Sequence, residues 1–188
     1  MPSTGALFTV DLEPAWASTT LPETWGKPNH CVRDVLQPLL RQLERNKVKG
    51  VFYVLGYVAQ NYPFITGHIT DHGHLIGSHG MWHRHNEREG DSSDQLARKH
   101  LGSDIYGYRS PYWDNTRCPG ISGGTWFRLL PARFIASQVR SSGTLWVHPH
   151  DLSRDPQDRY WRHKLFIGNP WEKLEYLLRE VDWRDPRE

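Results

Sequence analysis

Hydrophobic and polar positions along the chain follow two periods, one typical of strands and one typical of helices. Residues 6–12 alternate between the two kinds of side chain and predict a strand, whereas residues 32–46 carry apolar side chains at helical spacing. Further short apolar runs predict strands at 51–55, 74–77, 105–108 and 145–147, and helical patterns lie at 62–72, near 93–100, at 131–140 and at 170–182. Strands that alternate with helices predict an α/β fold with a mainly parallel sheet.

Prolines and one asparagine refine the predicted helices. Pro38 falls inside the pattern of 32–46 and predicts either a kink or a later start of that helix. Pro63 is well placed in the first turn of the helix at 62–72. Asn169 and Pro170 provide a cap and a first turn for the last helix. Residues 113–124 are rich in Gly, Pro, Asn and Asp, and predict a loop.

Length and composition set bounds on the class of protein. The 188 residues are expected to form a single domain, residues 1–188. Nine Trp, eight Tyr and six Phe suit a core beside a sugar-accommodating groove, although packing alone explains most of them. The net charge of +2 is small and scattered, and we expect neither nucleic acid nor a membrane as partner. With no secretion signal and no transmembrane run in view, the expected location is cytoplasmic.

A pair of histidines follows the predicted strand at 74–77. His79 and His83 are four residues apart, which would place both imidazoles on one face of a helical turn, where they could bind one divalent metal. With 11 histidines in 188 residues, chance alone supplies roughly 0.6 such pairs, and a second pair, His68 and His72, is expected to have no role. Only the residues at the other strand ends make a metal-binding role for His79 and His83 more than a chance match.

Those residues could complete a site at one edge of the sheet. Asp11 and Glu13 share a face at the end of the first strand, and Arg109 and His148 each follow a later strand. In a βα barrel the carboxyl ends of the strands form the rim of the active site.

The residue types suit metal-assisted hydrolysis. Two histidines and one carboxylate, with a water molecule in the open position, form a known catalytic zinc arrangement, and a second carboxylate could take the proton of that water. Arg109 could orient this carboxylate and keep it ionised, or it could be a surface arginine at a turn. His148 could protonate a leaving group or be structural, and Asp11 could merely end a strand beside a solvated Glu13.

Ordered motifs give the chain a family resemblance. They run from Phe8-Thr9-Val10-Asp11-Leu12-Glu13 through Gly73–His83 and Gly107-Tyr108-Arg109-Ser110-Pro111 to Trp146-Val147-His148-Pro149. With these motifs the chain resembles the polysaccharide deacetylases of the NodB-homology type (carbohydrate esterase family 4). It looks most similar to the branch associated with bacterial exopolysaccharide export.

The resemblance implies a shortened, incomplete and distorted (β/α) barrel that removes N-acetyl, or sometimes O-acetyl, groups from a sugar. The implied cofactor is one divalent metal ion, Zn²⁺ first, with Co²⁺, Ni²⁺ or Mn²⁺ as alternatives. The implied partner is an acetylated saccharide. By position, the implied site consists of the metal ligands His79 and His83, the base Asp11, its positioning residue Arg109, the acid His148 and the peptide N–H of Tyr112 as oxyanion donor. Rim aromatics, Tyr112, Trp113 and Trp126, could stack on a pyranose ring or belong to the core.

The chain departs from the family pattern in three places. The family has two adjacent aspartates in its first motif, whereas this chain has Asp11-Leu12-Glu13, so Glu13 is expected as the third ligand unless the two carboxylates exchange roles. The stretches 84–104 and 113–123 are short for the family. The aspartate that supports the histidine acid has no clear equivalent, with Asp114 as a weak candidate.

Three functions follow as hypotheses. The first is a metal-dependent sugar N-deacetylase. The second is a hydrolase of small non-peptide C–N bonds, such as those of ureides or formamides, on the same site. The third is an inactive relative that only binds glycans.

Overall fold

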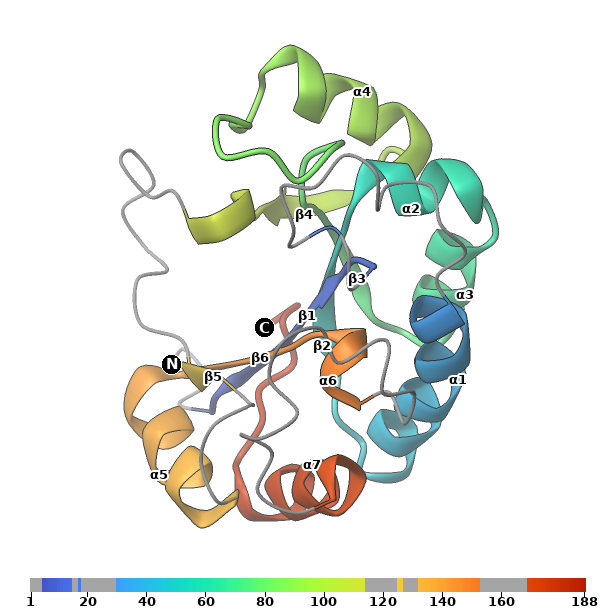
Figure 1. Cartoon of the computed structure of the whole chain (residues 1–188). Helices are drawn as coiled ribbons and strands as arrows, with labels where there is room; N and C mark the ends of the chain where they lie inside the picture. The colour runs from blue at the N-terminus through green and yellow to red at the C-terminus, as the bar shows by residue number, and fades with distance from the viewer. Residues whose placement is uncertain (1–4, 15–16, 18–29, 114–124, 127–131, 153–168) are drawn as a thin grey trace.

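Six parallel strands form one open sheet in the computed structural model, which describes residues 5–14, 17, 30–113, 125–126, 132–152 and 169–188. The strand order is β4-β3-β2-β1-β6-β5 (Figure 1). The strands are β1 (Leu7–Leu12), β2 (Gly50–Val54), β3 (Leu75–Ser78), β4 (Ile105–Tyr108), β5 (Thr125–Trp126) and β6 (Thr144–Val147). Among the described residues the two edge strands, β4 and β5, do not pair, so the sheet is not closed. The predicted α/β fold with an incomplete barrel is confirmed.

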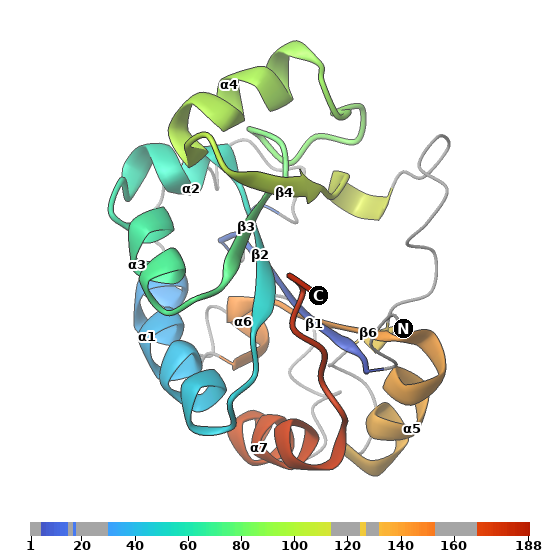
Figure 2. The same cartoon turned by 180° about the vertical axis from the view of Figure 1, so that it is seen from behind.

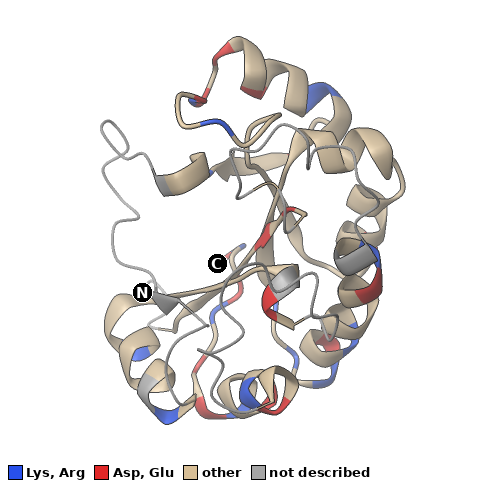
Figure 3. Cartoon of the chain, viewed as in Figure 1, with Lys and Arg blue, Asp and Glu red and all other residues tan. Residues whose placement is uncertain are grey.

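Helices surround the strands on the outside, as the front and back views show (Figures 1 and 2). They are α1 (His30–Arg45), α2 (Gly56–Asn61), α3 (Ile65–Asp71), α4 (Ser92–Leu101), α5 (Ala132–Ser142), α6 (Pro149–Leu152) and α7 (Pro170–Glu180), with a short 3-10 turn at Pro111–Trp113. Lys and Arg are interspersed with Asp and Glu over the outer helices (Figure 3).

The first helix continues through its proline. α1 begins at His30 and contains Pro38, so the alternative of a later start is wrong. A proline inside a helix removes one backbone hydrogen bond. Here the cost is offset by an apolar stripe, which includes Leu36, Leu39 and Leu43 and is buried in the core.

The helix expected at 62–72 is present in shorter form as α3, Ile65–Asp71, and a separate helix that the sequence did not predict, α2, precedes it at Gly56–Asn61. α2 ends at Asn61, and Tyr62 leaves the helical region with φ −131° and ψ 70°. Tyr62 precedes Pro63, and the proline ring disfavours the helical conformation for the residue before it. α3 therefore starts only at Ile65. The sequence pattern also missed β5 and α6, which are too short to show a period.

The central strand places polar side chains inside the molecule. All six residues of β1 are buried, between β2 on one side and β6 on the other. On one face of this strand lie Thr9 and Asp11, both almost inaccessible to water. Such groups are tolerated in an interior only when they have partners, which the site provides. No described helix combines the length and the apolarity needed to cross a membrane.

His74 is a buried histidine directly before β3, and it is hydrogen-bonded to the first residue of β2. His74 is 3% exposed, its Nδ1 accepts the Gly50 N–H at 3.1 Å, and its ring lies 5.1 Å from that of Phe52. Burial, with a contribution from the positive charge of Lys49, lowers the pKa of His74 from 6.5 to about 4. The ring is therefore neutral in the folded protein at neutral pH.

This predicts a loss of stability in weak acid. The unfolded chain takes up a proton on His74 below pH 6.5, whereas the folded chain does so only near pH 4. The contribution of His74 to the free energy of unfolding is therefore fully present above pH 6.5 and is lost as the pH falls from 6.5 to 4. At pH 5 the loss is about 2 kcal/mol. Urea unfolding at pH 7.5 and pH 5 measures it, and His74→Leu, which cannot titrate, should lose about 2 kcal/mol less than the wild type over the same interval. Equal losses in the two proteins would contradict the assignment.

Candidate active site

The six polar residues predicted at the strand ends, His83 included, lie at one edge of the sheet. Asp11 is in β1 and Glu13 follows it, while His79, Arg109 and His148 come directly after β3, β4 and β6. All except His148 are almost fully buried, and the His148 side chain is 14% exposed. Segments far apart in the sequence thus deliver their polar groups to one place.

Glu13, His79 and His83 form the tightest group. Glu13 Oε2 lies 2.7 Å from His83 Nε2 and 3.4 Å from His79 Nε2, and the possible ligand atoms of the three residues are all within 4.8 Å of one another. Burial alone raises the pKa of Glu13, but the charge of His83 and hydrogen bonds with both imidazoles lower this pKa well below its ordinary value. The group is therefore a buried carboxylate facing two ring nitrogens, which could hold a metal ion.

The ring of His79 is oriented by a hydrogen bond to the backbone of Arg109. Its Nδ1 lies 2.8 Å from the Arg109 carbonyl oxygen, which can only accept, so Nδ1 carries the hydrogen. Nε2 is then the ring atom that faces Glu13, and in the neutral ring it carries the lone pair that could bind a metal ion. Proteins commonly orient metal-ligating histidines in this way.

The two histidines do not share a helical turn, and that prediction is wrong. Residues 79–83 form an irregular loop in which Gly80 and His83 both have positive φ, 73° and 55°. The loop is bound to its neighbours instead of to itself: the His79 N–H donates to the Val54 carbonyl at 3.1 Å, and the Gly80 carbonyl accepts the Gly56 N–H at 2.8 Å. The rings nevertheless lie 5.1 Å apart, because the loop turns back on itself.

Glu87, a residue that the sequence did not single out, holds this loop in place. It is buried, and its Oε1 accepts hydrogen bonds from the Trp82 N–H at 2.9 Å and from the Ser93 hydroxyl at 2.6 Å. Its carboxylate also packs against Gly80, where a Cβ atom would clash with it. Glycine is thus required at position 80 both for its φ and for this contact.

Arg109 is a buried cation paired with Asp11, as predicted from the sequence. Its Nη1 donates to Asp11 Oδ1, and its Nη2 donates to Thr9 Oγ1 at 3.0 Å. The guanidinium also lies 4.0 Å from the centre of the Tyr53 ring. The surface alternative for Arg109 is wrong. Thr9 was missed, although the alternation Thr9, Asp11, Glu13 would have placed it on the same face.

His148 lies between carboxylates. Its Nε2 is 3.7 Å from Asp11 Oδ2 and 3.9 Å from Glu13 Oε1, and its Nδ1 is 3.3 Å from Asp151 Oδ2. Burial lowers the pKa of His148, but the hydrogen bond and charge of Asp151, followed by the charges of Asp11 and Glu13, outweigh burial and raise this pKa above 6.5.

Asp151 is a further residue that the sequence analysis did not single out. It is 1% exposed and also accepts the His148 backbone N–H at 2.9 Å. It occupies the third position of α6, where an acidic side chain commonly reaches back to the residue that caps the helix. That spacing was the available signal. The earlier candidate, Asp114, lies outside the described residues.

The aromatic candidates are only partly described. Tyr112 is half-buried, with its ring centre 4.5 Å from that of His83 and its hydroxyl 3.5 Å from the Ala17 carbonyl oxygen. The side chains of Trp113 and Trp126 lie outside the described part of the structure.

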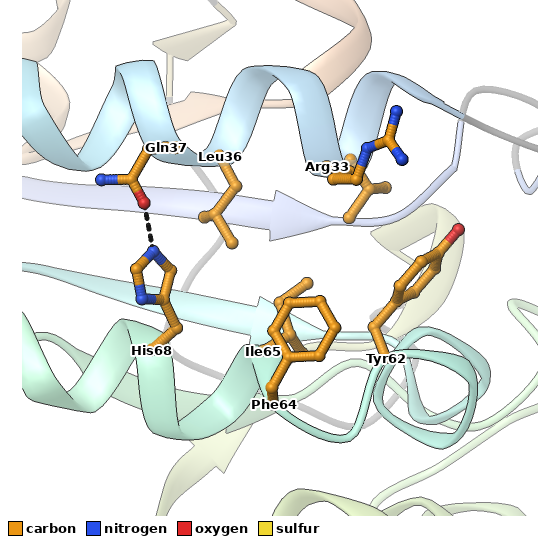
Figure 4. A pocket seen from close by; sticks show the side chains of 8 residues that line it. Arg33, Leu36, Gln37, Tyr62, Phe64, Ile65 and His68 are labelled. Atoms are coloured by element: carbon orange, nitrogen blue, oxygen red, sulfur yellow. Dashed lines mark hydrogen bonds between the residues drawn. The ribbon is translucent and has the colours of Figure 1, made fainter.

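A small cavity of about 140 Å³ lies elsewhere, between α1 and α3 (Figure 4). Its lining includes Phe64 and His68, and none of the residues at the strand ends. The Nε2 of His68 is hydrogen-bonded to Gln37 Oε1, and the Nδ1 of His72 is 2.8 Å from the His68 carbonyl oxygen. Among the described residues this second histidine pair has no third metal-ligating neighbour.

Comparison with known proteins identifies the family. The polysaccharide deacetylase family model matches residues 24–117, half of the chain. The chain belongs to the polysaccharide deacetylase family. The matched segment contains His79, His83 and Arg109, while Asp11 and His148 lie outside it. No curated protein sequence matches the chain.

Solved structures of polysaccharide deacetylases share the fold. A family 4 carbohydrate esterase from Streptomyces lividans, in complex with acetate, superimposes with a TM-score of 0.57 at 13% identity, covering 94% of this chain and 87% of the esterase. The polysaccharide deacetylase Bc1974 from Bacillus cereus gives 0.52 at 16% identity, covering 94% and 86%. The Bc1960 peptidoglycan N-acetylglucosamine deacetylase gives 0.53 at 19% identity, covering 78% and 72%.

The buried trio predicts a metal site that depends on each of its members. His83→Ala removes one imidazole and should weaken Zn²⁺ binding at least about 100-fold. Only two of the three donors remain, and the buried Glu13 carboxylate loses its His83 partner. Isothermal titration of metal-free protein measures the affinity.

The matched control is His72→Ala, which removes a histidine from the other pair and should leave Zn²⁺ affinity within about twofold of the wild type. Wild-type affinity in His83→Ala, with the fold intact by circular dichroism, would contradict the assignment of the ligands.

Proposed function

We propose that this polysaccharide deacetylase family member is a metal-dependent hydrolase that removes acetyl groups, N-acetyl first, from a saccharide. The observation that carries the proposal is the convergence of three buried units on one edge of the sheet: the Glu13–His79–His83 trio, the Asp11–Arg109 pair and the His148–Asp151 pair. Hydrolysis of an acetamide needs an electrophile, a base and an acid, and one unit is available for each.

The trio fits a divalent metal. Glu13 is buried, and its Oε2 lies 2.7 Å from His83 Nε2 and 3.4 Å from His79 Nε2. One carboxylate oxygen and two imidazole nitrogens form a donor set typical of zinc, and Co²⁺, Ni²⁺ or Mn²⁺ could also be bound. Such an ion supplies Lewis-acid polarisation of the acetyl carbonyl and lowers the pKa of a water molecule.

Asp11 is the proposed base and Glu13 the proposed ligand, and their different contacts support this assignment over the exchanged one. Glu13 is the carboxylate that lies against both histidines, whereas Asp11 is bound to Arg109. The Arg109 guanidinium, which is itself anchored by the Thr9 hydroxyl, holds the Asp11 carboxylate in place, where it could accept a proton from the attacking water.

His148 is the proposed general acid. Its Nε2 lies near the two carboxylates, and the raised pKa of His148 favours the protonated ring, which can donate to the departing amine. Asp151 holds the Nδ1 side of the ring, so that Nε2 is the atom left to face the substrate.

The peptide N–H of Tyr112 is the proposed oxyanion donor, beside the ring of His83. Tyr112, Trp113 and Trp126 are proposed to contact the sugar. An acetylated saccharide is the proposed substrate, by kinship with the family and with neighbours named as carbohydrate esterase or peptidoglycan deacetylase. The exopolysaccharide-export branch and a cytoplasmic location stay predictions.

The direct test is acetate release. Wild-type protein with one equivalent of Zn²⁺ should release acetate from N-acetylglucosamine oligomers, and His148→Ala should retain the metal while kcat falls by about 10²–10⁴-fold. Release of product only from ureides or formamides would favour the small-amide alternative. Glycan binding by the metal-loaded protein without any turnover would favour the inactive relative.

The pairing of His148 with Asp151 predicts a pH effect. A general acid must be protonated, so kcat/KM should fall as the pH rises through the raised pKa of His148. Asp151→Asn removes the hydrogen-bonded charge that raises this pKa. The carboxylates of Asp11 and Glu13 remain on the other side of the ring.

The alkaline limb of the kcat/KM profile should therefore move to lower pH in Asp151→Asn. The matched control, Asp104→Asn, changes an exposed aspartate at the start of β4 and should leave the profile unchanged. An unshifted limb in a folded, active Asp151→Asn protein would show that Asp151 does not set the proton affinity of His148.

A further inference from the structure

A histidine that has no place in the proposed mechanism covers the outer face of Tyr112. The rings of His85 and Tyr112 are stacked, with centroids 3.7 Å apart and an interplanar angle of 12°. The Tyr112 ring also contacts that of His83, with centroids 4.5 Å apart and an interplanar angle of 59°. One tyrosine thus contacts two histidines from a single loop. His85 itself is exposed to solvent.

Tyr112 has a backbone conformation that must be held by its surroundings. Its φ of 55° and ψ of 11° lie in the left-handed region, which disfavours residues with a Cβ atom. Such conformations persist where neighbouring contacts impose them. For the described residues, those contacts are the two histidine rings and the long hydrogen bond, 3.5 Å, from the tyrosine hydroxyl to the Ala17 carbonyl.

The conformation matters because φ at this residue sets the direction of its peptide N–H relative to its Cα atom and side chain. An oxyanion donor works only when it is fixed at the position that the developing charge will occupy. A side chain that fixes the Tyr112 ring therefore also fixes the direction of the proposed donor. The loop that carries His85 is itself braced by Glu87, so the stacking partner is attached to a fixed segment.

We propose that His85 is a positioning residue that holds Tyr112, by ring stacking, in the left-handed conformation that presents its peptide N–H to the reacting carbonyl. The proposal rests on the proposed deacetylase function. It concerns the aromatic face of His85, so an aromatic ring without ionisable nitrogens serves equally well. It also assigns a role in turnover to a residue outside the metal ligands, the base and the acid.

The test compares His85→Ala and His85→Phe with wild type in acetate release from N-acetylglucosamine oligomers at saturating Zn²⁺. Loss of an aromatic stack should lower kcat by about three- to tenfold in His85→Ala, and His85→Phe should restore it. KM should stay within about twofold of wild type, because an oxyanion donor acts in the transition state. The matched control is Asn86→Ala, an exposed neighbour on the same loop, with unchanged kcat.

A second measurement needs no turnover. Crystal structures of wild type and His85→Ala should show Tyr112 near φ 55° in the first and displaced in the second. An unchanged Tyr112 in His85→Ala, an increase in KM alone, or failure of phenylalanine to restore kcat would overturn the proposal. Wild-type protein that releases no acetate would instead refute the proposed function, and the two crystal structures would still decide whether His85 holds Tyr112.

Discussion

The pairing of Arg109 with Asp11 is the interaction on which the architecture of the site depends. Both groups are almost fully buried, and a buried charge without a partner costs several kcal/mol. In the order β4-β3-β2-β1, the arginine follows the edge strand β4 and reaches Asp11 on β1 past the Tyr53 ring of β2. The pair therefore ties the edge of the open sheet to its centre.

The two carboxylates near the end of β1 have different contacts. Asp11 accepts a hydrogen bond from Arg109, whose guanidinium also donates to the Thr9 hydroxyl. Glu13 lies against the ring nitrogens of His79 and His83, whose positive charge depends on protonation. A bound cation would balance the charge of Glu13 while accepting the lone pairs of both rings. Positions 11 and 13 thus suit different partners.

Periodicity was sufficient for the fold and for the location of the site, but not for its local geometry. The alternation of β1 and the short apolar runs after it predicted parallel strands whose carboxyl ends carry Asp11, His79, Arg109 and His148, since that edge follows from strand direction alone. The helical turn at 79–83 was wrong because spacing ignores the bonds from this loop to β2, which replace helical ones. Asp151 and Glu87 were missed because each acts through one tertiary or capping contact that leaves no period in the sequence.

Glu87 and Asp151 were missed because the loops of this fold are less constrained than its strands. The same freedom accounts for Glu13 and Asp151, whose positions differ from those expected for the family. The strand ends determine the position of each functional group. The sequence and conformation of the segment that carries the group can vary, provided that its side chain reaches that position. An aspartate three residues after His148 can therefore support the imidazole from the first turn of α6. A glutamate one residue beyond β1 can likewise face both histidines, because its longer side chain spans the extra distance. In this fold the parallel sheet fixes the site, and the loops supply the side chains that fill it.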